Sequence, residues 1–124
     1  MKLEVIIIDD DKILRKVLKR IIQICNLTKE VLEFENGEDA LAYFSSENYN
    51  SKKAIIFLDI NMPRINGWEF LQEMKKQNLL QNKEIYLLTS SIDKTEHCRA
   101  EQDPFIKDIL IKPLTIEKFK GLIS

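Results

Sequence analysis

Histidine, glycine, proline and cysteine are all scarce in this chain of 124 residues, which has 1 His, 3 Gly, 3 Pro and 2 Cys. A single histidine excludes any zinc site that needs two, and three scattered glycines exclude the GxGxxG and P-loop motifs for phosphate binding. Cys25 and Cys98 lie too far apart for a CxxC motif, so we expect two free thiols in a reducing compartment. Any chemistry must therefore rest on carboxylates, hydroxyls or lysine.

A surplus of charge and a long apolar run are missing as well. The 19 basic residues nearly balance the 20 acidic residues, and the net charge of −1 argues against a general binder of nucleic acid or membrane surfaces. No stretch approaches the roughly 20 apolar residues that span a bilayer. The apolar start of the chain is also too short for a secretory signal. We therefore expect a cytoplasmic protein with no membrane insertion and no direct contact with nucleic acid.

Short apolar runs alternate with amphipathic segments along the whole chain. With 44% hydrophobic residues the sequence is apolar enough to fold, and 124 residues suit one domain. The pattern predicts five strands, at residues 3–8, 31–34, 54–58, 85–88 and 109–111. It predicts a helix after each strand, at residues 13–22, 40–44, 68–74, 93–101 and 116–123. Five such units in a single domain, 1–124, favour an α/β fold with a doubly wound parallel sheet and helices on both faces.

Polar residues follow four of the five predicted strands. Ligands of open α/β sheets bind outside the carboxyl ends of the strands, so these residues are the candidates for a site. They are Asp9, Asp10, Asp11, Asp59, Asn61, Thr89, Ser90 and Lys112. Each alone has an ordinary structural explanation, such as a helix cap or a solvated surface position. Together they crowd carboxylates at one rim, and a pair 4 Å apart repels by about 4 kcal/mol at an effective dielectric near 20, which indicates a bound cation.

The chemistry of these strand-end residues indicates magnesium and phosphate. Oxygen ligands suit Mg²⁺, which prefers a pair of carboxylates together with a phosphate. An aspartate held beside Mg²⁺ can attack a phosphoryl group, and the aspartyl phosphate that forms carries about −1.5 to −2 charges. Three groups would stabilise that charge: a cation bound to Asp10, the hydroxyl of Thr89, and the ammonium of Lys112. The set is typical of a phosphoacceptor site. Without metal, we expect a raised pKa for at least one of Asp9, Asp10 and Asp59.

Five blocks of the sequence, in order and with matching spacing, resemble the receiver domain of two-component response regulators. They are 6–11 (IIIDDD), 58–63 (LDINMP), 66–67 (NG), 87–90 (LLTS) and 111–115 (IKPLT). The resemblance covers essentially the whole chain. It implies the flavodoxin-like (βα)5 receiver fold with strand order 2-1-3-4-5, and a Mg²⁺-dependent phosphoacceptor in a two-component phosphorelay.

The resemblance implies a role for each matching residue. Asp59 is the aspartate that takes the phosphoryl group from a phosphohistidine. Asp9 and Asp10 form the acidic pair that holds Mg²⁺ together with Asp59, and Asn61 adds its backbone carbonyl. The phosphodonor is a sensor histidine kinase or a phosphotransfer protein, and phosphorylation switches the binding of a downstream protein. On this interpretation the chain is not an enzyme, beyond catalysing its own phosphorylation and dephosphorylation.

The remaining matches complete the expected site. Thr89 corresponds to the switch hydroxyl and Lys112 to the lysine that pairs with the phosphoryl group. Gly67, Ser90 and Pro113 are structural positions near the site: Ser90 is small beside the phosphoryl entry path, and the peptide bond before Pro113 is usually cis in receivers. Receivers commonly present their first helix to the phosphodonor, so its basic side is a candidate docking surface.

Three features depart from the receiver pattern. Ile109 stands three positions before Lys112, where many receivers carry an aromatic that rotates inward on activation. The usual coupling between the switch threonine and this aromatic is therefore not expected here. Asn66 stands where Asp is common, a change of little consequence for a turn. Nothing follows the last predicted helix, so we expect a stand-alone receiver with no output domain. Asp11 is expected to cap the first helix rather than to bind metal.

Three alternatives remain open at this stage. A flavodoxin-like FMN carrier would need a hydroxyl-rich and glycine-rich loop after the first strand, where this chain has three aspartates. A phosphatase of the haloacid dehalogenase type would need a DxD pair, whereas Asp59 is followed by Ile60 and Asn61. A degenerate receiver that acts only as a binding module is disfavoured by the intact set of Asp10, Asp59, Thr89 and Lys112.

Overall fold

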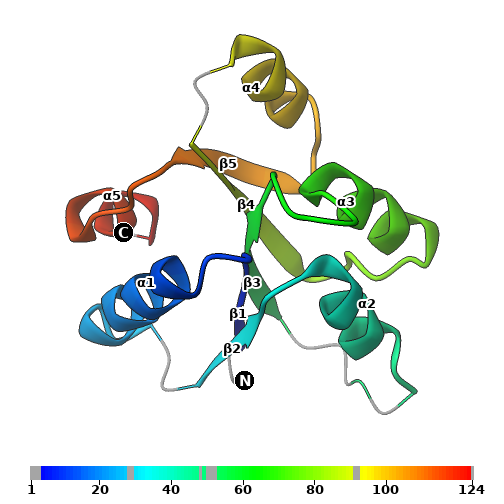
Figure 1. Ribbon diagram of the computed structural model, residues 1–124, viewed down its shortest axis with the longest axis horizontal. Coiled ribbons are helices and arrows are strands. Elements are labelled where there is room, and N and C mark those ends of the chain that lie inside the picture. Colours follow the sequence, from blue (N-terminus) through cyan, green and yellow to red (C-terminus); the bar gives the residue numbers. More distant parts are fainter. Residues whose placement is uncertain (1–3, 28–29, 48, 50–52, 91–92, 124) are drawn as a thin grey trace.

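One five-stranded parallel sheet forms the centre of the domain (Figure 1). The computed structural model describes residues 4–27, 30–47, 49, 53–90 and 93–123. The strands are β1 (Glu4–Ile8), β2 (Val31–Phe34), β3 (Ala54–Asp59), β4 (Lys83–Thr89) and β5 (Ile106–Ile111). Their order in the sheet is β2-β1-β3-β4-β5, and each neighbouring pair is parallel. The predicted α/β class and the strand order 2-1-3-4-5 are confirmed.

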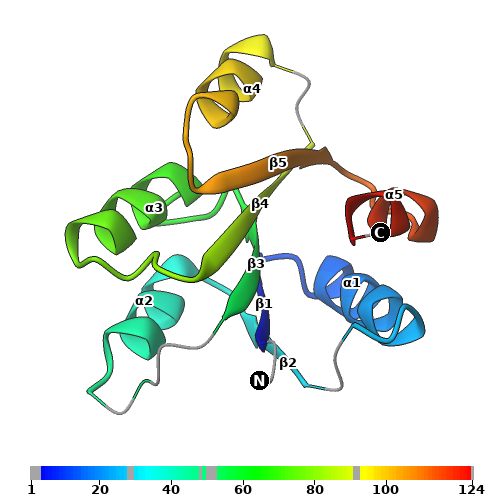
Figure 2. The same ribbon diagram turned by 180° about the vertical axis from the view of Figure 1, so that it is seen from behind.

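Helices cover both faces of this sheet. They are α1 (Lys12–Ile24), α2 (Gly37–Ser45), α3 (Gly67–Lys76), α4 (Lys94–Glu101) and α5 (Ile116–Ile123). Helices α1 and α5 lie on one face, and α2, α3 and α4 lie on the other, as Figures 1 and 2 show from opposite sides. None of the helices in the described part of the chain has the length and apolar character needed to cross a membrane.

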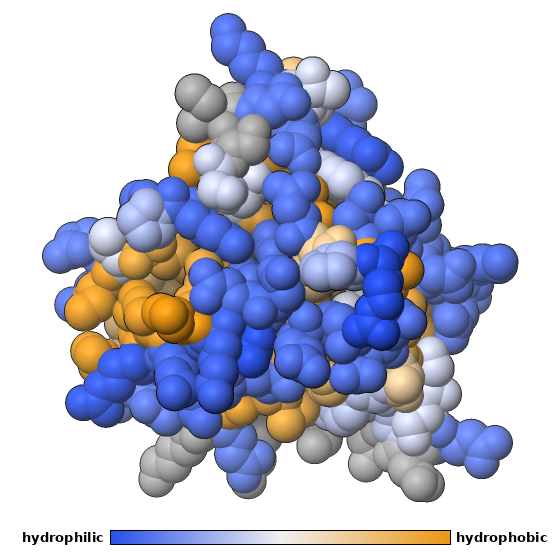
Figure 3. All heavy atoms as spheres, in the orientation of Figure 1, coloured by the Kyte–Doolittle hydropathy of each residue, from blue (hydrophilic) through white to orange (hydrophobic). Residues whose placement is uncertain are grey.

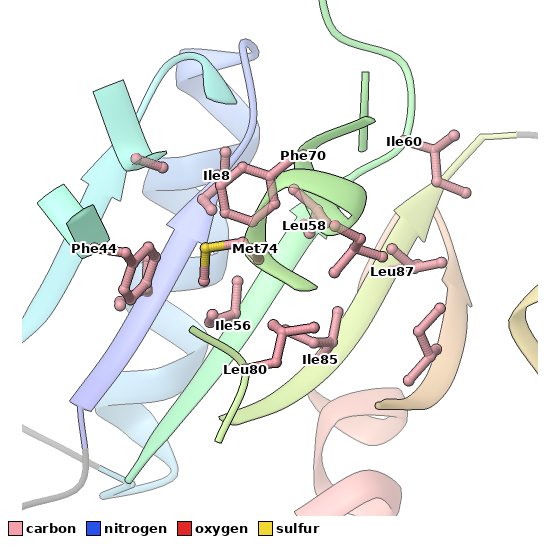
Figure 4. Packing of buried hydrophobic residues seen from close by; sticks show 14 of the residues in the cluster. Ile8, Phe44, Ile56, Leu58, Ile60, Phe70, Met74, Leu80, Ile85 and Leu87 are labelled. Atoms are coloured by element: carbon pink, nitrogen blue, oxygen red, sulfur yellow. The ribbon is translucent and has the colours of Figure 1, made fainter. Parts of the chain in front are cut away.

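The central strands β1 and β3 are buried almost throughout, because helices cover both of their faces. Successive residues of a strand point to opposite faces, so the sheet separates two apolar clusters. Leu58 packs with Phe44 and Phe70 beneath α2 and α3 (Figure 4). Phe57 points the other way, and its ring centroid lies 5.8 Å from that of Phe119 on α5. This packing on two sides fixes the strand end from which Asp59 projects.

Polar side chains cap the first turns of α1, α4 and α5. The Asp11 carboxylate accepts hydrogen bonds from two backbone N–H groups in the first turn of α1, at 2.9 and 3.2 Å. Asp93 accepts one at the start of α4, and the Thr115 hydroxyl accepts one at the start of α5. Asp11 is therefore the predicted N-cap of α1 and not part of the site.

Three strands are longer than the apolar pattern predicts, and β3 exceeds it by one residue, Asp59. β5 begins at Ile106, three residues before the predicted start at residue 109. The sequence pattern missed these residues because Lys107 and Asp108 are exposed on this edge strand and interrupt the apolar run. β4 begins at Lys83, whose side chain is buried with its ammonium 5.1 Å from the ring centroid of Tyr49. Residue 3 of the first predicted strand lies outside the described residues.

Candidate functional site

The candidate site lies at the carboxyl ends of the strands. Strands β3 and β4 end on Asp59 and Thr89, and β1 and β5 end directly before Asp9 and Lys112. The winding reverses between β1 and β3, because β2 lies on one side of β1 and β3 on the other. Such a switch point is where open α/β sheets bind ligands. The fold therefore brings these four predicted residues to one edge of the sheet.

Three carboxylates gather at this edge. Asp9, Asp10 and Asp59, which we call the acidic cluster, each offer an oxygen within 4.8 Å of the others. Asp9 and Asp59 are buried, at 0% and 3% exposure, whereas Asp10 is exposed. Three close carboxylates repel one another, and oxygen donors of this kind suit Mg²⁺. The acidic cluster could therefore hold a divalent cation.

Lys112 supplies the positive charge nearest to the buried carboxylates. Its Nζ lies 2.9 Å from Oδ2 of Asp9 and 3.4 Å from Oδ1 of Asp59. Burial alone lowers the pKa of the Lys112 ammonium, but the hydrogen bonds and negative charges of Asp9 and Asp59 outweigh it, so that the pKa is raised. Lys112 is therefore charged at neutral pH and available to bind an anion.

Asp59 has the most strongly perturbed carboxyl of the site. Its pKa is raised to about 7, chiefly by burial and then by the negative charge of Asp9, with a smaller contribution from a hydrogen bond with Asp10. The ammonium of Lys112 and the backbone N–H of Asn61, which donates to Oδ1 at 3.2 Å, act in the opposite direction. The expected raised pKa in the acidic cluster is confirmed, and burial together with the charge of Asp9 outweighs the opposing effect of Lys112.

Gly67 allows α3 to begin directly against the backbone of Asp59. A Cβ at Gly67 would lie 2.7 Å from the Asp59 carbonyl oxygen and 3.0 Å from Cα of Ile60. Its N–H donates to the Ile60 carbonyl at 2.8 Å. Asn66 and Glu69 form a reciprocal capping box at the start of α3. Only glycine fits this close approach, so Gly67 helps to hold the segment that carries Asp59.

The other predicted residues lie around the acidic cluster. Thr89 is fully buried, and its carbonyl accepts a hydrogen bond from the N–H of Lys112 at 2.8 Å, which joins the ends of β4 and β5. Ser90 follows and is exposed. The peptide bond between Lys112 and Pro113 is cis, as the receiver pattern implies. Ile109 is partly buried and packs against the apolar cluster beneath α2 and α3, in keeping with its apolar side chain.

Two contacts near the site were not foreseen from the sequence. Arg15, in the first part of α1, donates from Nη1 to the backbone carbonyl of Asp9 at 2.5 Å. Arg99 of α4 places its guanidinium carbon 4.2 Å from the ring centroid of Trp68, the residue after Gly67. Both arginines occupy polar helix faces, which are usually solvated, so the sequence carries no signal that separates them from surface residues.

The chain belongs to the family of response regulator receiver domains, whose sequence model matches residues 5–124. Members of this family are phosphoacceptors of two-component signalling, and this is the family that the sequence motifs predicted. The match includes every residue placed in the site.

Individual relatives agree with this assignment. Sensory transduction protein LytT of Oceanobacillus iheyensis is 30% identical over 120 residues, which are 97% of this chain but 46% of LytT, so the chain spans less than half of that protein. The crystal structure of a two component response regulator from Cytophaga hutchinsonii superposes with a TM-score of 0.81 and 30% identity over 97% of this chain and 92% of that one. The structure of chemotaxis protein CheY4 of Vibrio cholerae, 22% identical, superposes with a TM-score of 0.78 over 98% of this chain and 95% of that one, and shares the fold.

Proposed function

We propose that this domain is the phosphoacceptor of a two-component phosphorelay and that Asp59 takes the phosphoryl group. One observation carries the proposal: oxygens of Asp9, Asp10 and Asp59 lie within 4.8 Å of one another, and the ammonium of Lys112 lies 3.4 Å from Asp59. A fold gains nothing from crowding three carboxylates, but phosphoryl transfer uses a nucleophile, a cation and an anion-binding group in this arrangement.

The donor set fits magnesium. Asp9, Asp10 and Asp59, with the backbone carbonyl of Asn61, are the residues that would hold Mg²⁺. All of these donors are oxygens, and the exposed side of the acidic cluster at Asp10 leaves room for the waters that Mg²⁺ keeps. When bound, the ion would supply positive charge that offsets both the carboxylates and the phosphoryl oxygens.

The residues of the chain perform the transfer as follows. A carboxylate oxygen of Asp59 attacks phosphorus and forms an O–P bond while the N–P bond of the phosphohistidine breaks, and the released imidazole takes a proton from water. Lys112 then pairs with oxygens of the new phosphoryl group. The hydroxyl of Thr89 donates a hydrogen bond to the same group. These contacts replace the ion pair that Lys112 makes with Asp59 before transfer.

The phosphodonor we propose is a histidine kinase or a phosphotransfer protein that binds at α1. Ile13 and Val17 of α1 are exposed, at 74% and 48%. With Pro113 and Leu114 they line a groove of about 400 Å³ that reaches Lys112. Figure 3 shows apolar side chains gathered where α1 and α5 lie. The groove would bring a phosphohistidine on a partner to the edge of the acidic cluster.

The output we propose is a switch in the binding of a downstream protein at α4 and the loop before it. Thr89 directly precedes this loop, so a movement of its hydroxyl toward the phosphoryl group would pull on the loop. Ala100 is the only buried residue among the eight of α4, so little apolar packing opposes a shift of this helix. Ile109 has no polar end, and we therefore expect no inward swing of its side chain.

The alternatives fit the site less well. Three aspartates after β1 would repel the phosphate of FMN, with Asp9 buried at the strand end. Asp59 is followed by Ile60, which is 2% exposed, and by Asn61, so the second aspartate of a haloacid dehalogenase is missing. A degenerate receiver remains an outcome of the experiment below.

Intact mass measurement tests the proposal. Acetyl phosphate with Mg²⁺ is expected to add one phosphoryl group to the wild type and none to Asp59→Asn. Asp11→Asn is the matched control, because it makes the same substitution at the aspartate next to Asp10, which caps α1 instead of joining the acidic cluster. Labelling that persists in Asp59→Asn would refute the assignment, and no labelling of the wild type would leave a receiver that acts only as a binding module.

A further inference from the structure

The backbone N–H and carbonyl of Asp9 are both hydrogen-bonded, the first to strand β2 and the second to Arg15, which itself contacts β2. The Asp9 N–H donates to the carbonyl of Phe34 at 3.1 Å. The Asp9 carbonyl accepts from Nη1 of Arg15 at 2.5 Å. That carbonyl belongs to the peptide group joining Asp9 to Asp10, so the guanidinium contacts the peptide between two residues of the acidic cluster.

Arg15 is itself fixed in place. Its Nε lies 3.2 Å from Oε1 of Glu33 on β2, and its side chain is 11% exposed. A planar guanidinium can hold the carbonyl and the carboxylate at the same time with two separate N–H groups, which a lysine ammonium on a flexible stem does poorly. Lys19, one turn further along α1, lies 3.8 Å from Oε2 of the same Glu33 but makes no contact with Asp9 in the described structure.

The orientation of this peptide sets the directions of the carboxylates. Oδ1 of Asp9 accepts the N–H of Asp11 at 2.9 Å, and Oδ2 faces Lys112. A rotation of the peptide after Asp9 would therefore move the Asp9 carboxylate and would turn the exposed side chain of Asp10. Residues that orient metal ligands in this way commonly change metal affinity tenfold or more when they are replaced.

We propose that Arg15 is a positioning residue for the divalent cation site, held by Glu33, and that it acts through its hydrogen bond to the Asp9 carbonyl rather than through its charge. The inference rests on the proposed function insofar as the acidic cluster binds Mg²⁺. Charge and geometry predict opposite results for this residue. A cation near a cation site repels the ion, so charge alone predicts that removal of Arg15 strengthens Mg²⁺ binding. Positioning predicts that removal weakens it.

The test is calorimetric titration of the full chain with Mg²⁺ alone, at constant ionic strength. Arg15→Ala is expected to raise the dissociation constant roughly tenfold. Arg15→Lys keeps the charge and loses the paired contacts, and a rise of at least about threefold is expected. Lys19→Ala is the matched control: it removes a charge from the same helix and the same partner, and its dissociation constant is expected to stay within about twofold of the wild type.

Urea unfolding in EDTA accompanies the titrations and shows whether each variant is folded where it is measured. The proposal is overturned if Arg15→Ala and Arg15→Lys bind Mg²⁺ as tightly as the wild type, or more tightly. If Arg15→Ala does not fold, Arg15→Lys alone decides between these results. A wild type that binds no Mg²⁺ would overturn the metal site and this inference together, whereas a wild type that binds beside unaffected variants would overturn the inference only.

Discussion

Lys112 reaches across β4 to place its ammonium 3.4 Å from Oδ1 of Asp59, which ends a strand two places away in the sheet. The same ammonium lies 2.9 Å from Oδ2 of Asp9. One positive charge thus serves two buried carboxylates, with Asp10 close by. The negative charge that is left over makes the metal-free site unfavourable on its own.

Neutralising Asp59 is expected to stabilise the metal-free protein. The rise of the Asp59 pKa from 3.8 to about 7 corresponds to at most about 4 kcal/mol, and relaxation around the charge reduces this. We expect Asp59→Asn to raise the free energy of unfolding by about 2 kcal/mol at pH 8 in EDTA, measured by urea unfolding. Asp11→Asn, which keeps a good N-cap, is expected to change it by less than about 0.5 kcal/mol.

The pH dependence of this gain has a definite sign. A carboxyl with a raised folded pKa keeps its proton to a higher pH in the folded protein than in the unfolded chain, so its contribution to stability falls as pH rises from about 4 to about 7. The wild type and Asp59→Asn should therefore be nearly equal at pH 4 and diverge up to about pH 8. A variant less stable than the wild type at pH 8 would show that the Asp59 carboxylate stabilises the fold.

Magnesium is expected to offset the loss of stability that the ionised carboxylates of the acidic cluster cause. A ligand at 100 times its dissociation constant adds about 2.7 kcal/mol to the free energy of unfolding. Mg²⁺ should give the wild type this gain and should give Asp10→Asn and Asp59→Asn less than half of it, since each lacks one carboxylate of the acidic cluster. The measurement is urea unfolding with and without Mg²⁺ at constant ionic strength. Equal gains in all three proteins would contradict a metal site at these residues.

A methyl group at Gly67 is expected to disturb the segment of Asp59. The added Cβ would lie 2.7 Å from the Asp59 carbonyl oxygen, a backbone atom that cannot turn away. We expect Gly67→Ala to lower the free energy of unfolding by about 2 kcal/mol. Gly121→Ala provides the control: among the described residues, its added Cβ has no neighbour within 4 Å outside its own helix backbone, and alanine in a helix is expected to add up to about 1 kcal/mol. Similar effects of both substitutions on urea unfolding would rule out the clash.

Arg99 is expected to shield Trp68. Its guanidinium lies over the ring at 4.2 Å and links α4 to the start of α3. We expect Arg99→Ala to lower the free energy of unfolding by about 0.5–1 kcal/mol and to move the emission of the only tryptophan to longer wavelength. Lys94→Ala, on the exposed first turn of the same helix, should leave the emission unchanged. An unshifted spectrum for Arg99→Ala would argue against the stacked pair.

The central strands β1 and β3, and the polar residues that follow them, were predictable from the sequence, whereas the edge strand β5 was predicted only in part. β1 and β3 are covered on both faces, so their residues form continuous apolar runs, and the polar residues that follow them stand out. β5 is an edge strand whose exposed Lys107 and Asp108 erase that pattern, and its first half was missed. The N-cap Asp11 is local in sequence and was correctly predicted.

The contacts of Arg15 and Arg99 were not predictable in this way. Arg15 and Arg99 sit on polar faces, where most arginines are solvated, and their partners are a backbone carbonyl and a ring on another helix. Neither contact leaves a spacing or a periodicity in the sequence. The sequence predicted a raised pKa within the acidic cluster, but not that Asp59 carries it. That assignment, and the raised pKa of Lys112, depend on burial and distances that only the folded chain defines.

The most direct test of the account is to locate the phosphoryl group by peptide mapping after treatment with acetyl phosphate, once with Mg²⁺ and once with EDTA. A single modified residue, Asp59, is expected in the Mg²⁺ sample and none in the EDTA sample. Modification of another residue, or equal modification of Asp59 in EDTA, would contradict the claim that the acidic cluster at the ends of β1 and β3 is a metal-dependent phosphoacceptor site.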